Sequence, residues 1–144
     1  MPKLWKEIDK TILRALPNPT DQAYEIKVKI PEFTFLGVQE QPDFATVFLT
    51  FYPKDKIIEL KSLKQYAFHL RDITVSYERL INIFYDHLME VYEPERLRIA
   101  MICNPRGGIS SRLTIDSDWA VRGGEEKFKD WAQSVGEDQW QVVM

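Results

Sequence analysis

The run from Phe44 to Tyr52 (FATVFLTFY) is the feature that most restricts what this chain can fold into. Its β-branched and aromatic residues favour a strand, and it is apolar on both faces instead of alternating apolar with polar residues. A small sheet covered by helices on one face leaves such a strand poorly protected and leaves its edges open. The run therefore favours a sheet that associates with further copies of itself.

Three other segments alternate apolar and polar residues with the period of a strand: 24–30, 97–103 and 109–115. Between the second and third strands, apolar residues recur at helical spacing in two segments, 63–70 and 77–91. The order strand, strand, helix, helix, strand, strand predicts an α+β fold with an antiparallel four-stranded sheet and two helices on one face. Residues 21–144 are expected to form this single domain, with short helical turns near 125–133.

The first 20 residues are expected to form an N-terminal helical arm. Leu4, Trp5, Ile8 and Ile12 recur at helical spacing before a segment with two prolines, 17–19 (PNP), ends the pattern. This spacing predicts a short amphipathic helix. Its apolar stripe needs a cover, which is either its own domain or a neighbouring subunit.

Charge and cysteine content exclude several classes of protein. The formal net charge of −3 argues against general nucleic-acid binding, for which a basic surface is expected. No apolar run approaches the ~20 residues that a membrane-spanning helix needs. Cys103 is the only cysteine, which fits a reducing compartment, and His69 and His87 lack partners at metal-ligand spacing. We expect a cytoplasmic protein with no metal, nucleic-acid or membrane partner.

The segment Glu59 to Tyr66 (ELKSLKQY) carries candidate ligand-binding groups where a strand-like run gives way to a helix-like one. Lys61 and Lys64 are three residues apart, so they share one face of a helix. Two ammonium groups on one face suit a phosphorylated ligand, and the carboxylate of Glu59 suits a donor-rich one. The same residues could instead form a solvated basic face, with Ser62 as a helix cap.

Several separate blocks, in the right order, resemble the NADPH-dependent 7-cyano-7-deazaguanine reductases, the QueF type of the tunnelling-fold superfamily. The similarity extends from about residue 31 to about residue 117. The blocks are 31–34 (PEFT), 41–46 (QPDFAT), 59–66 (ELKSLKQY), Glu78 with Asn82, and 105–110 (PRGGIS). The resemblance implies a tunnelling fold, a homo-oligomeric ring with sites between subunits, and a role in queuosine biosynthesis, a tRNA modification.

The resemblance also implies a mechanism. In this family a loop cysteine attacks the nitrile carbon to form a thioimide, which NADPH then reduces by two hydride transfers. Gly37 stands where that cysteine is expected, in a loop about one residue shorter. Asp43 matches the acidic residue thought to protonate the nitrile nitrogen, and is the candidate general acid, although it could simply open a strand. Tyr77 replaces an expected histidine, and Cys103 falls at a position typical of the core.

Binding roles follow from the same resemblance. Glu78 matches the glutamate that holds the purine-like edge of the substrate, because a carboxylate can accept two neighbouring N–H donors. Its alternative role is a first-turn helix glutamate. Glu59 is a second candidate for substrate binding. The residues expected to contact NADPH are Lys61, Ser62, Lys64, Arg106 and Gly107.

Three functions remain open. The chain could be an NADPH-dependent nitrile reductase, as the 59–66 block and Arg106 favour and as Gly37 and Tyr77 oppose. It could be a diverged enzyme that acts on a purine or pterin by different chemistry, as Asp43 and Glu78 favour. It could be a ligand-binding or structural subunit without catalysis. We expect a tunnelling-fold homo-oligomer that holds a purine-like or 7-deazaguanine molecule at subunit interfaces.

Overall fold

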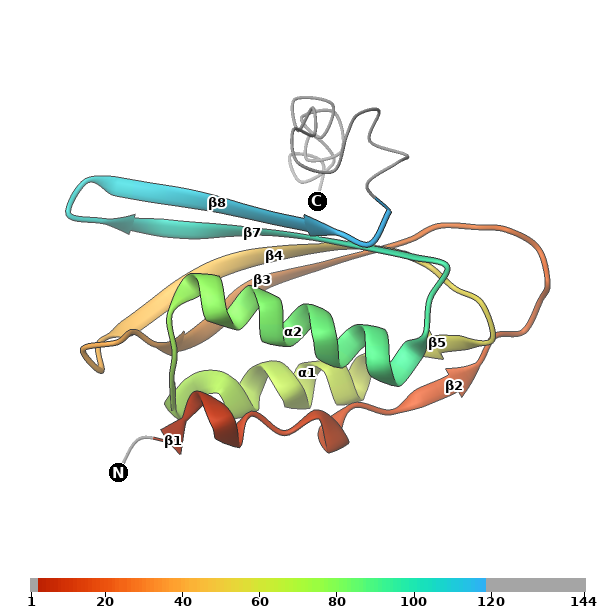
Figure 1. The fold of residues 1–144 in the computed structure, drawn as a ribbon, viewed down its shortest axis with the longest axis horizontal. Helices are drawn as coiled ribbons and strands as arrows, with labels where there is room; N and C mark the ends of the chain where they lie inside the picture. Colours follow the sequence, from red (N-terminus) through yellow and green to blue (C-terminus); the bar gives the residue numbers. More distant parts are fainter. Residues whose placement is uncertain (1–2, 119–144) are drawn as a thin grey trace.

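The structure, a computed structural model, describes residues 3–118 (Figure 1). Its long strands are β3 (Ile26–Leu36), β4 (Pro42–Tyr52), β7 (Arg96–Arg106) and β8 (Ile109–Asp116), and its helices are α1 (Leu60–His69) and α2 (Tyr77–Tyr92). Short elements complete it: strands β1 (Lys3–Leu4), β2 (Ala15–Pro17), β5 (Lys56–Ile58) and β6 (Ile73–Thr74), with 3-10 turns at 5–7, 10–12 and 70–72. The helical turns expected near 125–133 lie outside the described residues.

The predicted α+β architecture is confirmed, with differences in detail. The four long strands form an antiparallel sheet in the order β3-β4-β7-β8, and both helices cover the same face of it (Figure 1). The described sheet has six strands in place of the expected four, because β6 joins β3 and β1 joins β6, both in parallel. The extra strands are only two residues long, and no period-two pattern marks them in the sequence.

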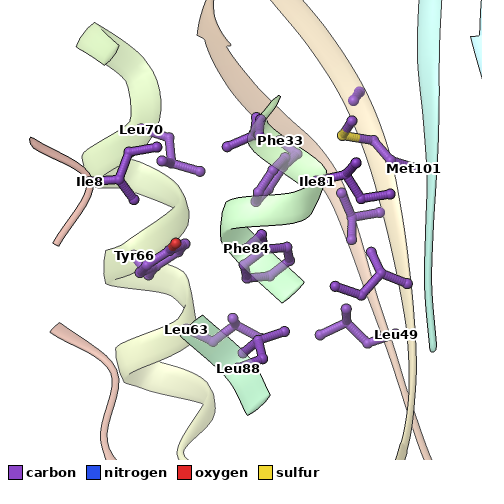
Figure 2. Packing of buried hydrophobic residues seen from close by; sticks show 14 of the residues in the cluster. Ile8, Phe33, Leu49, Leu63, Tyr66, Leu70, Ile81, Phe84, Leu88 and Met101 are labelled. Carbon is purple, nitrogen blue, oxygen red and sulfur yellow. The ribbon is translucent and has the colours of Figure 1, made fainter. Parts of the chain in front are cut away.

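The apolar run 44–52 falls in β4, which lies inside the sheet. β4 pairs with β3 on one side and with β7 on the other. Ala45, Val47, Leu49 and Phe51 of this strand belong to the hydrophobic core, which fills the space between the sheet and the helices. In Figure 2 the ring of Phe84 from α2 lies between Tyr66 of α1 and the sheet.

The prediction of an amphipathic helix in the N-terminal arm is wrong. The arm instead contains two short 3-10 turns between strands β1 and β2, and it runs alongside α1 (Figure 1). Its ends are held in extended conformation by pairing, β1 with β6 and β2 with β5. Ile8 and Leu13 of the arm are buried in the core, whereas Leu4 and Leu16 are exposed. Hydrogen bonds to distant strands, which the local spacing cannot indicate, replace those of a helix.

Candidate functional site

The turn between β3 and β4 places two of the implicated residues, Gly37 and Asp43, close together. The backbone N–H of Gly37 donates to the carbonyl of Gln41 at 2.7 Å, and the N–H of Glu40 donates to the carbonyl of Gly37 at 2.7 Å. Glu40 has a φ of +62°, a left-handed conformation that closes this tight loop. As a result Gly37, at one end of the loop, faces the first residues of β4, including Asp43.

Asp43 is buried at the start of β4 and is held from the next hairpin. Its Oδ1 accepts a hydrogen bond from Nη1 of Arg106 at 2.7 Å, and the same nitrogen donates to the carbonyl of Pro42 at 3.0 Å. Asp43 is 4% exposed, so this contact gives a buried carboxylate a charged donor. Arg106 comes from the end of β7, which lies beside the start of β4 because the two strands are antiparallel.

Gly37 is buried, and the side chains of Gln41 and Asp43 fill the space that a side chain on it would use. A Cβ built there would lie 2.7 Å from Cδ of Gln41 and still closer to Nε2 of Gln41 and Oδ2 of Asp43. Gln41 therefore occupies the space next to the predicted nucleophile position. Sequence reasoning used Gln41 only to mark the end of the loop, and the shortened loop was the one signal that could have drawn attention to it.

Tyr77 and Glu78 begin α2 beside this group. The Tyr77 ring packs edge-on against Phe35, with 5.6 Å between ring centroids. Burial, followed by the charge of Asp43, raises the pKa of Tyr77 above its usual value. Glu78 is exposed, and Ser76 caps the helix by accepting a hydrogen bond from the N–H of Arg79 at 3.2 Å.

Cys103 lies in β7 close to the same group, but its thiol faces the core. It is 1% exposed, and burial raises its pKa to about 11, with smaller contributions from Glu78 and Asp43. Nucleophilic cysteines need a large fraction of thiolate at neutral pH. Cys103 is thus poorly suited to replace the expected nucleophile, as the core assignment from sequence suggested.

The residues of the 59–66 block separate into two kinds. Ser62 is completely buried: its hydroxyl donates to the carbonyl of Glu59 at 2.7 Å and accepts from the N–H of Arg14 at 2.9 Å. Ser62 thus joins the arm to α1. Lys61 and Lys64 are exposed on α1, and Glu59 is half-buried where the helix begins.

Lys64 lines a cavity of about 600 Å³ between α1 and β3. Its walls are mainly apolar, and Lys29 of β3 and Arg71 contribute two further cations next to one carboxylate, Glu32. Asp43 and Arg106 are not part of this lining. The predicted substrate and cofactor residues therefore fall into two groups within this chain. Sequence analysis missed Lys29 and Arg71, because the strand edge and the helix face that bring them together are far apart in the chain.

Residues 3–118 contain neither a helix suited to spanning a membrane nor a cluster of metal-ligating side chains. None of the helices there is long and apolar enough to cross a membrane. No three histidine, cysteine, aspartate or glutamate side chains in that part of the chain lie close enough to share a metal ion.

Comparison with known proteins gives one family and one fold. Residues 42–121, more than half of the chain, match the model of a family described as QueF-like protein. A reductase from Wolinella succinogenes, named NADPH-dependent 7-cyano-7-deazaguanine reductase, is 36% identical over 113 residues, which cover 78% of this chain and 91% of that protein. A protein of the same name from Gloeothece citriformis is 35% identical over 116 residues, covering 77% of this chain and 82% of its own length.

The fold is also found in a solved structure. The crystal structure of the archaeosine synthase QueF-Like in the apo form superimposes with a TM-score of 0.57. The superposition covers 66% of this chain and 92% of that one, at 11% sequence identity. Similarity at this level of identity establishes the shared fold.

Proposed function

This chain belongs to the QueF family, and from that membership we propose that it binds a purine-like base of the 7-deazaguanine type without forming a covalent bond to it. The observation that carries the proposal is the surroundings of Gly37. This position has no side chain to attack a nitrile, and Gln41 and Asp43 fill the space where one would project. The only thiol, Cys103, is buried with a raised pKa. Thioimide formation is therefore absent from the proposed function.

Base recognition is assigned to two carboxylates. Glu78 is exposed at the start of α2, where its two oxygens can accept neighbouring N–H groups of a guanine-like edge. Asp43 is proposed to accept a hydrogen bond from a ligand nitrogen, in place of acting as a general acid. Glu59 is a less direct candidate, because it is half-buried and does not line the cavity beside Lys64.

NADPH is the cofactor in the names of the relatives, and this chain has cations that fit its phosphates. Lys29, Lys64 and Arg71 surround the cavity between α1 and β3, and exposed Lys61 lies on the same helix. When bound, the cofactor supplies hydride to a reducible bond. Arg106 fits this role less well, because one of its nitrogens is engaged by Asp43 and Pro42.

We also propose that the protein is a cytoplasmic homo-oligomer with its ligand at subunit contacts. Within the described residues, the outer edge of β3 is paired only near Leu36, through Thr74 and Val75. Most of this edge therefore presents backbone groups that another strand could pair with. Light scattering coupled to size exclusion measures the mass of the assembly, and a monomer at micromolar concentration would contradict this part.

A titration of 7-cyano-7-deazaguanine in a calorimeter, paired with NADPH absorbance, tests the proposed function. We expect binding, but no nitrile-dependent NADPH oxidation. Glu78→Gln should weaken the affinity about tenfold, the effect of one charged hydrogen bond. The matched control is Glu95→Gln, which changes an exposed glutamate just before β7, at the opposite end of that strand from Arg106. This control should leave the affinity unchanged. Turnover of the nitrile, or an affinity indifferent to Glu78→Gln, would contradict the proposal.

A diverged enzyme with different chemistry is the second candidate, and Tyr77 favours it. Its phenol lies close enough to Asp43 for the carboxylate to raise its pKa, so a donor and an acceptor of protons are neighbours. Incubation of the protein with purines and pterins, followed by mass spectrometry of the small molecules, tests this. New products that disappear in Tyr77→Phe would favour it, and unchanged compounds would favour binding alone.

A further inference from the structure

The side chain of Gln41 fills the space that a residue other than glycine would use at position 37. A Cβ on Gly37 would lie 2.7 Å from Cδ of Gln41, and the Nε2 of Gln41 would be nearer still. Non-bonded carbon atoms in contact lie about 3.5–4.0 Å apart, so no side chain fits here while Gln41 keeps its place. Oδ2 of Asp43 enters the same space from the other side.

Two hydrogen bonds fix the Gln41 carboxamide in this position. Its Oε1 accepts from the backbone N–H of Gln39 at 3.1 Å, and its Nε2 donates to Oδ2 of Asp43 at 3.4 Å. A carboxamide nitrogen carries two hydrogens, so one N–H of Gln41 is left over after the contact with Asp43. The nitrogen that replaces a side chain at position 37 is thus a donor that is not nucleophilic.

Starting from the proposed function, we propose that Gln41 determines the specificity of the site for bases whose five-membered ring carries a hydrogen-bond acceptor. Such an acceptor is a nitrile nitrogen or the oxygen of a carboxamide. The free N–H of Gln41 donates to it, so the substituent is held by a hydrogen bond and no covalent bond forms. Asp43 does not supply this donor, because its two oxygens accept hydrogen bonds from Gln41 and Arg106.

The first test needs no ligand. Gly37→Ala should lower the melting temperature by roughly 5 °C, since the new methyl group collides with Gln41 and Asp43. If Gln41 fills that space, Gly37→Ala combined with Gln41→Ala should lower it by clearly less than the sum of the single changes. Gln39→Ala, which removes an exposed amide from the same loop, is the control. Its shift in melting temperature should add to that of Gly37→Ala. Additive shifts for Gly37→Ala and Gln41→Ala would overturn the placement of Gln41.

The second test compares two ligands by calorimetry: 7-cyano-7-deazaguanine and 7-deazaguanine, which lacks the nitrile. Gln41→Ala should weaken the binding of the nitrile compound about tenfold and change the affinity for 7-deazaguanine by no more than about twofold. Gln41→Glu, which removes the donor, should likewise weaken the binding of the nitrile compound more than that of 7-deazaguanine. Equal effects on both ligands, or no effect on either, would overturn this inference while the proposed function stands. If the unmodified protein binds neither base, the proposed function fails, and the specificity role fails with it.

Discussion

Nη1 of Arg106 lies 2.7 Å from Oδ1 of Asp43. This contact joins the β7–β8 hairpin to the β3–β4 hairpin, next to the turn of each. Asp43 is buried, whereas the Arg106 side chain is 48% exposed. The bond therefore gives a carboxylate that has left water a charged donor, while the guanidinium keeps part of its hydration. Both residues lie in the segment 42–121 that matches the family model, and the link fixes their positions relative to each other.

Arg106→Ala should lower the free energy of unfolding by about 1–2 kcal/mol. The change leaves the buried Asp43 carboxylate without its charged partner, and the half-exposure of Arg106 reduces the cost below that of a fully buried pair. Urea denaturation followed by circular dichroism measures it. Lys61→Ala, an exposed cation on α1, is the control and should stay within about 0.5 kcal/mol. Equal losses in the two variants would show that the ion pair is not the cause.

Acidification should destabilise the protein through His87. Its Nδ1 lies 2.8 Å from the hydroxyl of Tyr66, and burial keeps this hydroxyl protonated by raising the pKa of Tyr66. Burial lowers the pKa of His87 below its usual value of 6.5, despite the opposing charge of Glu90. Between the lowered value and 6.5 the unfolded chain binds more protons, so stability is complete above that window and is lost as the pH falls through it.

Urea midpoints measured above and below this window test the prediction. The midpoint should fall as the pH decreases from about 7.5 to about 5, and the fall should be smaller in His87→Gln, which removes the titrating group. The charges that face His87, on Lys10, Asp9, Asp86 and Glu90, remain in both proteins, so their contributions cancel in the comparison. An identical pH dependence in the two proteins would refute a role for His87.

Ser62→Ala should loosen the N-terminal arm. The hydroxyl of Ser62 both donates to the carbonyl of Glu59 and accepts from the N–H of Arg14, so its removal leaves the Arg14 N–H without this partner. The expected loss is about 1–2 kcal/mol. Hydrogen exchange at the Arg14 amide should become faster, while exchange in the centre of β4 follows only the global loss. Ser110→Ala, at an exposed position of β8, should alter neither quantity.

Cys103 should react slowly with iodoacetamide in the native protein. Burial raises its pKa to about 11 and also limits access to the thiol. At neutral pH we expect alkylation to be at least about 100-fold slower than in the urea-unfolded chain, because the reactive thiolate is rarer by that factor. Rapid native alkylation would show that β7 opens or that the thiol faces a pocket, and the search for a nucleophile would then return to Cys103.

The sequence alone predicted the order of the long elements. Alternation in 97–103 and the apolar run in 44–52 led directly to β7 and β4, because both patterns are typical of strands. The N-terminal arm could not be predicted in this way. Leu4, Trp5, Ile8 and Ile12 have helical spacing, yet pairing with β6 and β5 keeps the ends of the arm extended.

The candidate site, like the fold, could be predicted from the sequence only in part. Residue type and spacing were enough to identify Asp43, Glu78 and Gly37, because the chemistry of each, or its absence, is visible in the sequence. Only the tertiary structure showed that Gln41 takes up the space beside Gly37 and that Arg106 is bonded to Asp43. Local pattern reflects interactions between residues close in the chain, whereas the filling of a space and the pairing of two charges depend on segments that meet only after the sheet has formed.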